Sequence, residues 1–319
     1  MASHEAIGLS RSRVFELCDP LALLLHCAAM TDTSLIALVE QTRVSLQTAL
    51  DHQVLSLGHG TDTALDEAAW LVLWSAGLPL DTELDHRILS SAQIESAQAL
   101  LAQRLTTRKP LAYLTQEAWL HGIPFYVDPR VIVPRSLIAE PLLNGSLDPW
   151  LSPDTHRVLD LCTGNGSLAV LTAMVYPEVR VDAADISTDA LAVADINIDK
   201  HQLTHRVHTT VSDGLSALVG PYDLVLCNPP YVNSDSMAAL PDEYCQEPTI
   251  SLAGGSDGMD FIRPMLAALP QLLSEHGVLV LEIGHEREHF ESAFPHLNPV
   301  WLATSAGDDH VLLLTKDML

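Results

Sequence analysis

The sequence predicts an α/β protein in which a smaller helical domain precedes a buried, mostly parallel β-sheet. Two observations support this prediction. From about residue 136 onward, short apolar runs alternate with segments of helical periodicity, which is typical of βαβ units. Before residue 107, apolar residues recur instead at the spacing of amphipathic helices. The length of 319 residues accommodates about two domains.

Residues 1–106 are expected to form the helical, substrate-binding domain. Within it, residues 61–79 (TDTALDEAAWLVLWSAGLP) are expected to be a helix whose capping box uses Thr63 and Glu67. A second, longer helix is expected over residues 83–105 (ELDHRILSSAQIESAQALLAQRL). No side chain of this domain is chemically distinctive.

Residues 107–135 are expected to be a β-hairpin linker, because they are rich in aromatic and β-branched residues and are punctuated by Gly122 and Pro124. Residues 136–319 are expected to form the second domain. Its candidate strands are residues 157–162, 179–186, 207–213, 222–227, 277–284, 299–303 and 310–315. Ligands of such sheets bind beyond the carboxyl ends of the strands, so functional residues should follow strands.

The chain is strongly acidic, with 41 acidic and 16 basic residues and a net charge of −25. Such a surface repels phosphate backbones, so we expect no direct nucleic-acid specificity and favour a basic partner. Adaptation to a salty environment explains the charge equally well.

The five cysteines are odd in number and contain no C-x-x-C motif, which favours a reducing cytoplasm. No apolar run reaches about 18 residues, so no membrane span is expected. Residues 21–30 (LALLLHCAAM) resemble the core of a signal peptide. However, Glu16 and Asp19 precede them and a helical pattern follows, which favours a helix.

The segment RVLDLCTGNGSLAV has the order strand, glycine turn, helix. Gly164 and Gly166 allow a ligand to approach the backbone closely. The pattern is weaker than G-x-G-x-x-G, because Leu168 and Ala169 occupy the region of the third glycine. A purely structural turn therefore remains the alternative to nucleotide-type binding.

Acidic residues accompany three consecutive strands, namely Asp160 on the first, Asp185 at the end of the second and Asp213 at the end of the third. Asp185 can accept hydrogen bonds from both hydroxyls of a ribose, and Asp213 from the amino group of an adenine. Alone, each is more often a helix N-cap or a turn former. Together they indicate an adenosine, and the sulfonium cation of S-adenosylmethionine suits an acidic pocket better than a pyrophosphate does.

The next strand ends in NPPY, residues 228–231. The two prolines remove two backbone donors and make a rigid, open turn. The side-chain carbonyl of Asn228 and the backbone carbonyl of Pro229 can together accept both hydrogens of a planar –NH2 group, on which Tyr231 can stack. Methyl transfer to such a nitrogen needs mainly positioning. A simple strand-ending turn is the alternative.

The motifs NPPY and DLCTGNG resemble those of amino-methyltransferases that act on planar nitrogens in DNA adenine, ribosomal RNA guanine or protein glutamine. Residues 108–136 resemble the hairpin and "PR" turn of the protein glutamine methyltransferases. VPRS, DLCTG, LPDEYCQEP and LAGGSDGMD resemble the branch that methylates large-subunit ribosomal protein three, whereas the release-factor branch tends to carry PRPDTE and DLGTG. The resemblance begins near residue 60, and Leu137 departs from it where relatives usually have proline.

The resemblance implies a seven-stranded, Rossmann-like class I methyltransferase domain that methylates a glutamine side-chain amide of ribosomal protein three in the cytoplasm. It implies no metal. The expected cofactor-binding residues are Asp160, Cys162, Thr163, Gly164, Asn165, Gly166, Asp185, Ile186, Asp213, Gly214 and Asn228. The expected catalytic residues are Asn228, Pro229, Pro230 and Tyr231. Arg135 and Glu140 lie in the shared turn and either shape the site or form structural ion pairs.

Three alternatives remain. A release-factor glutamine methyltransferase would share the chemistry and differ in the protein it labels. A nucleic-acid amino-methyltransferase would need a basic face, and one that acts on a duplex must flip the base. A non-catalytic ribosome-assembly factor would retain the fold without the activity.

Two further patterns are assigned structural roles. HEREH, residues 285–289, matches the H-E-x-x-H zinc signature, but it follows a strand directly and is expected to be a charged helix start. GDDH, residues 307–310, is expected to be a hairpin turn before the last strand. Cys162 and Cys227 flank the expected pocket, where packing is their expected role.

Overall fold

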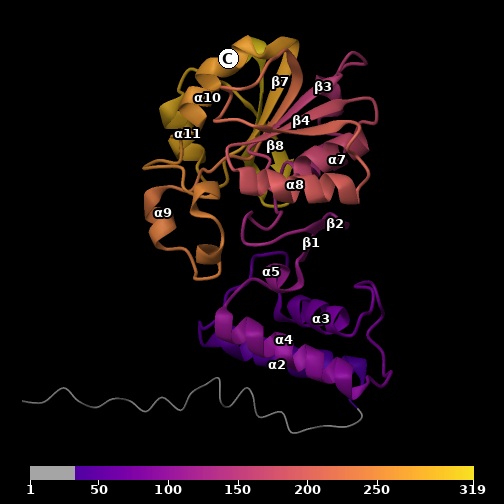
Figure 1. Ribbon diagram of the computed structural model, residues 1–319. Coiled ribbons are helices and arrows are strands. Elements are labelled where there is room, and N and C mark those ends of the chain that lie inside the picture. Colours follow the sequence, from indigo (N-terminus) through magenta and orange to yellow (C-terminus); the bar gives the residue numbers. More distant parts are fainter. Residues whose placement is uncertain (1–32) are drawn as a thin grey trace, which may run out of the picture.

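The computed structural model describes residues 33–319, so the segment that resembles a signal peptide, residues 21–30, lies outside the described residues. In this described part of the chain, four helices come first: α2 (Leu35–Asp51), α3 (Ala64–Ser75), α4 (Ser91–Thr107) and α5 (Leu111–Thr115). They pack around one apolar core and form a separate layer below the rest of the molecule (Figure 1). Within residues 33–319, no helix is both long and apolar enough to cross a membrane.

Two details of this helical part correct the sequence analysis. Thr63 is the N-cap of α3, but its partner is Asp66, because Glu67 lies one position too far along and turns inward to Arg104. The helix expected from residue 83 begins only at Ser91. Ser90 and Gln93 form the capping box there, which sets the start of the helix.

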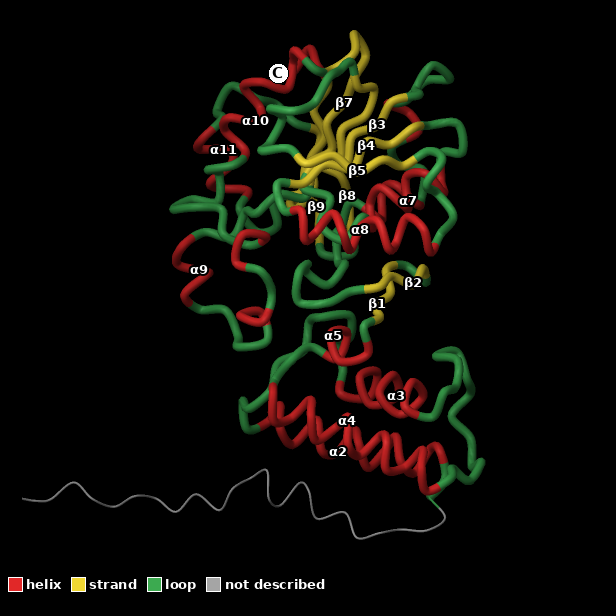
Figure 2. The backbone as a smooth tube through the Cα atoms, viewed as in Figure 1, coloured by secondary structure: helices red, strands yellow, loops and turns green. Residues whose placement is uncertain are grey.

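A β-hairpin of β1 (Glu117–Leu120) and β2 (Ile123–Tyr126) lies between the helical part and the sheet, as Figure 2 shows, which confirms the hairpin linker. The exact division of the chain at residues 106 and 135 stays a prediction.

All seven expected strands are present in one sheet with the order β5-β4-β3-β6-β7-β9-β8. The first five strands of this order pair in parallel, and β9 pairs antiparallel with β7 and β8. The α/β fold class is confirmed. The strands are β3 (Arg157–Leu161), β4 (Arg180–Asp185), β5 (Val207–Val211), β6 (Tyr222–Cys227), β7 (Leu273–Glu282), β8 (Val300–Thr304) and β9 (Gly307–Thr315).

Alternate residues of the strands enter two apolar cores on opposite faces of the sheet. Val158 packs into the core that includes α7 (Ser167–Val175) and α8 (Thr188–Lys200), whereas Leu159 packs into the core that includes α10 (Ile262–Ala268) and α11 (Arg287–Ala293). The remaining helices are α6 (Ala139–Leu143), α9 (Ser234–Ala238) and the 3₁₀ turns Asp148–Trp150, Tyr244–Gln246, Thr249–Ser251, Leu269–Gln271 and Lys316–Met318.

The prediction of a hairpin turn at GDDH, residues 307–310, is wrong. β9 begins at Gly307, which pairs with Thr304, so the connection is formed by Ser305 and Ala306. The hydroxyl of Thr304 donates a hydrogen bond to the carbonyl of Gly307 (2.8 Å) and closes this shorter turn.

Candidate active site

A first cavity of about 170 Å³ lies at the carboxyl ends of β3, β4 and β6, where the fold class places ligands. It is called the cofactor cavity below. The sequence-predicted residues that line it are Cys162, Gly164, Asp185, Ile186, Asp213, Gly214, Asn228 and Pro230. The sequence analysis missed several of its wall residues, including Ile132, Ile250, Ser251 and Phe261. They come from segments that contact the strand ends only in the folded chain.

Asp185 holds the glycine turn against the end of β4. One of its carboxylate oxygens accepts a hydrogen bond from the backbone N–H of Gly164, and the other accepts one from Ser187, both at 2.9 Å. Burial raises the pKa of Asp185 because water no longer solvates its charge. A cation or hydroxyl donors in the cavity would stabilise the ionised form.

Asp160 does not line the cavity but lies behind the glycine turn. It accepts hydrogen bonds from the hydroxyl of Thr163 (2.5 Å) and the backbone N–H of Ala169 (2.9 Å), so it joins β3 to the start of α7. Burial raises the pKa of Asp160 to about 7. Thr163, Asn165 and Gly166 also lie outside the cavity walls, so the contact role expected for these four residues stays a prediction.

Asn197 was missed by the sequence analysis. This fully buried residue of α8 donates hydrogen bonds to the carbonyls of Asn165 (2.8 Å) and Tyr126 (3.0 Å). It therefore connects the glycine turn to the β-hairpin. A polar residue inside an amphipathic helix gave no signal that distinguished it from its neighbours.

The two cysteines at the strand ends are placed for packing rather than reaction. Cys162 lines the cofactor cavity and has a left-handed backbone conformation (φ 62°). A hydrogen bond with the thiol of Cys227, together with burial, raises the pKa of the Cys162 thiol well above its usual range. A protonated thiol is a poor nucleophile.

A second cavity of about 340 Å³ adjoins the first and is called the acceptor cavity below. Asn228 lines both cavities, whereas Pro229 and Tyr231 line the acceptor cavity and Pro230 lines the cofactor cavity. The structure therefore divides NPPY between two adjoining spaces. Leu137, the expected departure from the family pattern, also lines the acceptor cavity.

Glu282 at the end of β7 connects NPPY to the VPRS turn. It accepts hydrogen bonds from the hydroxyls of Tyr231 (3.1 Å) and Ser136 (2.6 Å) and from the backbone N–H of Leu137 (2.9 Å). Burial raises the pKa of Glu282. The sequence analysis missed this residue because a single acid after an apolar strand resembles an ordinary strand end.

The charged residues of the shared turn form structural contacts. Arg135 makes a two-pronged ion pair with the buried Glu247 (2.6 and 2.7 Å), and it also lines the acceptor cavity. Burial would raise the pKa of Glu247, but the hydrogen bonds from Arg135 and the nearby ring of His59, 3.7 Å away, hold this pKa down at about 2. Glu140 accepts a hydrogen bond from the backbone N–H of Ser305 (2.7 Å) in the connection between β8 and β9.

HEREH crosses the junction of a strand and a helix. α11 begins at Arg287, so His285 and His289 do not share one helix. Instead, His285 lies 3.0 Å from a ring nitrogen of His310, and His289 lies 2.5 Å from Glu286. Within residues 33–319, no group of three or more histidine, cysteine or acidic side chains is arranged to hold a metal ion.

The walls of the cofactor cavity suit a positively charged nucleoside. Among the residues that the structure describes, those lining this cavity include two carboxylates, Asp185 and Asp213, and no lysine or arginine. A pyrophosphate would need donors or cations there, whereas ribose hydroxyls, an adenine amino group and a sulfonium need acceptors and negative charge. The residues present therefore fit S-adenosylmethionine.

Proteins with similar sequences support the same class. A family model described as "Methyltransferase small domain" matches residues 142–242. A Bordetella pertussis protein named ribosomal protein uL3 glutamine methyltransferase is 52% identical over 271 residues, which cover 83% of this chain and 90% of that protein. A Burkholderia pseudomallei protein of the same name is 50% identical over 273 residues, with 82% and 88% covered.

Among solved structures, ribosomal protein L11 methylase from Lactobacillus delbrueckii subsp. bulgaricus is 18% identical to this chain and covers 59% of it and 82% of its own chain, with a TM-score of 0.41.

The seven-stranded sheet and the cavity at its strand ends define a class I methyltransferase that uses S-adenosylmethionine. The chain belongs to the family of ribosomal protein uL3 glutamine methyltransferases.

Proposed function

We propose that this protein transfers a methyl group from S-adenosylmethionine to the side-chain amide nitrogen of a glutamine in ribosomal protein uL3. The single observation that carries the proposal is the position of Asn228, which lines the cofactor cavity and the acceptor cavity at once. A group held by this side chain lies at the boundary between the two spaces. That is where a methyl group must pass from donor to acceptor.

The acceptor amide is held by the NPPY turn. The side-chain carbonyl of Asn228 and the backbone carbonyl of Pro229 accept the two N–H hydrogens, and the ring of Tyr231 packs on the amide plane. The cofactor supplies the methyl group. The amide nitrogen would gain the bond to the methyl carbon as the sulfur–carbon bond of the sulfonium breaks and a neutral thioether leaves, and one N–H proton would pass to water. Positioning rather than a strong base is therefore the main requirement.

On the donor side, we assign Asp185 to the ribose hydroxyls and Asp213 to the adenine amino group. Both carboxylates line the cofactor cavity. Asp160, Thr163, Asn165 and Gly166 contribute by fixing the glycine turn from behind, as the hydrogen bonds of Asp160 indicate.

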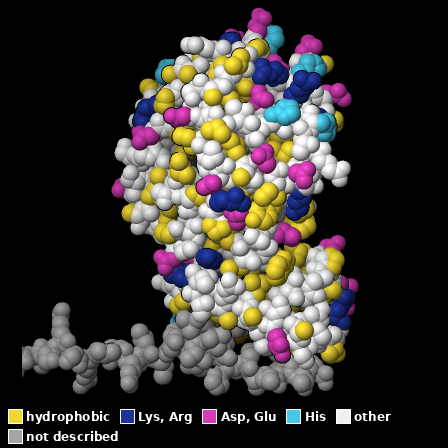
Figure 3. All heavy atoms as spheres, in the orientation of Figure 1, with side chains coloured by type: hydrophobic (Ala, Val, Ile, Leu, Met, Phe, Trp, Pro, Cys, Tyr) yellow, Lys and Arg dark blue, Asp and Glu magenta, His cyan; other side chains and the backbone are white. Residues whose placement is uncertain are grey.

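The name of the relatives and the charge of the chain support uL3 as the substrate. The relatives are named for that protein, and a net charge of −25 complements a basic ribosomal protein. On the face seen in Figure 3, Lys and Arg side chains of the described residues are scattered among acidic ones rather than merged into a basic surface. We therefore propose no direct nucleic-acid specificity. We also propose a substrate-binding role for the helical domain (residues 1–106) and a cytoplasmic location.

A labelling assay tests the proposal. The purified protein and methyl-labelled S-adenosylmethionine are mixed separately with isolated uL3, assembled ribosomes, release factor and adenine-containing DNA, and mass spectrometry locates the methyl group. We expect label on a glutamine of uL3. Label on release factor would preserve the chemistry and reject the substrate, whereas label on DNA alone would reject both.

A further inference from the structure

The chain between β6 and α10 leaves the sheet and returns to it as one long loop, residues 233–253, called the cavity loop below. Its ends are fastened together, because Val232 donates a hydrogen bond to the carbonyl of Leu252 and accepts one from Gly254, both at 2.9 Å. Figures 1 and 2 show this loop, which carries α9, extending from the sheet toward the helical domain.

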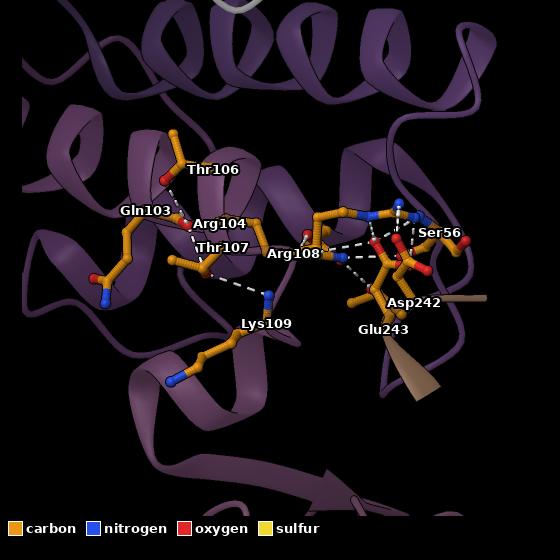
Figure 4. A network of polar contacts seen from close by, with 11 residues as sticks. Ser56, Gln103, Arg104, Thr106, Thr107, Arg108, Lys109, Asp242 and Glu243 are labelled. Carbon is orange, nitrogen blue, oxygen red and sulfur yellow. Dashed lines mark hydrogen bonds and ion pairs between the residues drawn. The ribbon is translucent and has the colours of Figure 1, made fainter. Parts of the chain in front are cut away.

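The helical domain holds the tip of the cavity loop through a buried ionic network, which Figure 4 shows from close by. Glu243 is fully buried and accepts hydrogen bonds from Arg108 (3.0 Å) and from the backbone N–H of Ser56 (3.0 Å). Arg104 lies 3.5 Å from Glu243 and donates hydrogen bonds to Glu67 (2.8 Å) and to the carbonyl of Ser56 (2.9 Å).

The residue after Glu243 forms part of the wall of the acceptor cavity. The ring of Tyr244 lines that cavity and lies 4.3 Å, centre to centre, from the ring of His59 in the helical domain. The guanidinium carbon of Arg135 lies 5.3 Å from the centre of the Tyr244 ring. The helical domain and the VPRS turn therefore fix this aromatic wall from two sides.

Stability alone does not explain why these charges are buried. Removing Arg104 and Glu243 from water is costly, and apolar side chains of similar size would often stabilise a core equally well. What the ionic network adds is one defined arrangement, because each charge accepts few geometries. Here the arrangement so defined is that of the helical domain relative to the wall of the acceptor cavity.

We propose that Arg108 and Glu243 are positioning residues for methyl transfer: they hold Tyr244 in the wall of the acceptor cavity, so that the helical domain controls entry of the glutamine. The inference rests on the proposed function, in which this cavity receives the glutamine side chain. It assigns to the helical domain an effect on the reacting centre in addition to its proposed contact with the substrate.

The first test is the substitution Arg108→Ala, assayed with the full chain and isolated uL3. We expect kcat/KM for uL3 to fall about tenfold, mostly through KM, on the scale of losing one charged hydrogen-bond partner. The affinity for S-adenosylmethionine, measured by calorimetry, should equal that of the wild-type protein. An equal loss of kcat/KM for uL3 and of affinity for S-adenosylmethionine would indicate general loosening of the fold and would overturn the proposal.

Asp242→Asn provides the matched control. Asp242 also pairs with Arg108 (2.5 Å), but its side chain is 66% exposed and that of Arg108 is 26% exposed, so this contact is weak in water. We expect near wild-type kinetics from Asp242→Asn and partial recovery from Arg108→Lys, which keeps the charge. A loss with Asp242→Asn as large as with Arg108→Ala would contradict the assignment to Glu243.

A double variant tests whether Arg108 acts through Tyr244. If it does, Arg108→Ala combined with Tyr244→Ala should be no worse than Tyr244→Ala alone. Additive losses would show that Arg108 does not act through Tyr244 and would overturn the proposal.

Hydrogen exchange gives a readout that does not depend on the substrate. Arg108→Ala should speed exchange of the amides in residues 242–252 while leaving the central strands protected. Unchanged exchange there would overturn the proposal even if uL3 is methylated. Faster exchange in a protein that never labels uL3 would instead reject the proposed function and retain the positioning role.

Discussion

The cofactor cavity and the acceptor cavity adjoin at Asn228 but are built in different ways. Most of the cofactor cavity consists of turns that directly follow strands of one parallel sheet. The acceptor cavity is assembled from the VPRS turn, NPPY, the cavity loop, the end of β7 and the β8–β9 connection. The first cavity is mainly a property of the sheet, with a few wall residues from distant segments, whereas the second depends mainly on how distant segments close around it.

Asn228→Ala should have the largest effect, because Asn228 belongs to both cavities. We expect turnover to fall by about 10²–10³-fold, the scale for removing one preorganised hydrogen-bonding group from a reacting centre. Cofactor binding should be nearly intact. Methyl transfer to uL3 and calorimetric titration would measure the two effects, with Asn144→Ala, a change at an exposed residue that lines neither cavity, as the control. Unchanged turnover would remove Asn228 from the proposed clamp.

Two glycine substitutions compare the cavities directly. Gly284→Ala should lower the free energy of unfolding by about 2–4 kcal/mol, since its φ of 53° is strained for alanine and a Cβ would lie 2.5 Å from the ring of Tyr231. Gly164→Ala should cost only about 1–2 kcal/mol, because its φ is similar but nothing lies within 4 Å. Urea unfolding measures both. Equal losses would mean that the acceptor cavity around Gly284 is no more tightly packed than the cofactor cavity around Gly164.

Asp185→Ala should weaken binding of S-adenosylmethionine by about 1–3 kcal/mol, the range for losing a charged hydrogen-bond partner. The KM for uL3 should change little, because Asp185 lines only the cofactor cavity. Asp189→Ala, an exposed acid in the first turn of α8, is the matched control. Unaltered cofactor affinity would reduce Asp185 to a turn residue.

The last effects concern pH, and they have opposite signs for two buried acids that lie beside the cavities, Asp160 and Glu247. The pKa of Asp160 is raised from 3.8 to about 7, so its stabilising contribution is present below pH 3.8 and is lost as pH rises through 7. The pKa of Glu247 is lowered from 4.5 to about 2, so its contribution is present above pH 4.5 and is lost as pH falls toward 2.

Substitutions isolate these contributions. Asp160→Asn should flatten the decline in unfolding free energy between pH 4 and 7, and Glu247→Gln should flatten the decline below pH 4.5. Urea unfolding over a pH series would detect both. If each variant kept the wild-type slope in its own window, the shifted pKa values would not affect stability.

The same contrast explains what could be predicted from the sequence. The seven strands and the residues directly after them are local features, so Asp185 and Asn228 were found from the order of apolar runs and turns. Glu282 and Tyr244 were missed, because their contacts join residues far apart in the chain. The late start of α4 was missed because the apolar pattern already begins upstream of Ser90, the residue that caps the helix.

Asn228 forms a wall common to the two cavities, and this shared wall suggests a design for inhibitors. A molecule that links an adenosine to a glutamine-like amide through a short spacer would occupy both cavities at once, and the second contact would then form at a high effective concentration. Enzymes that only resemble the cofactor half would lack the proposed amide-binding half. Such a compound would therefore gain its selectivity from contacts in the acceptor cavity and much of its affinity from contacts in the cofactor cavity.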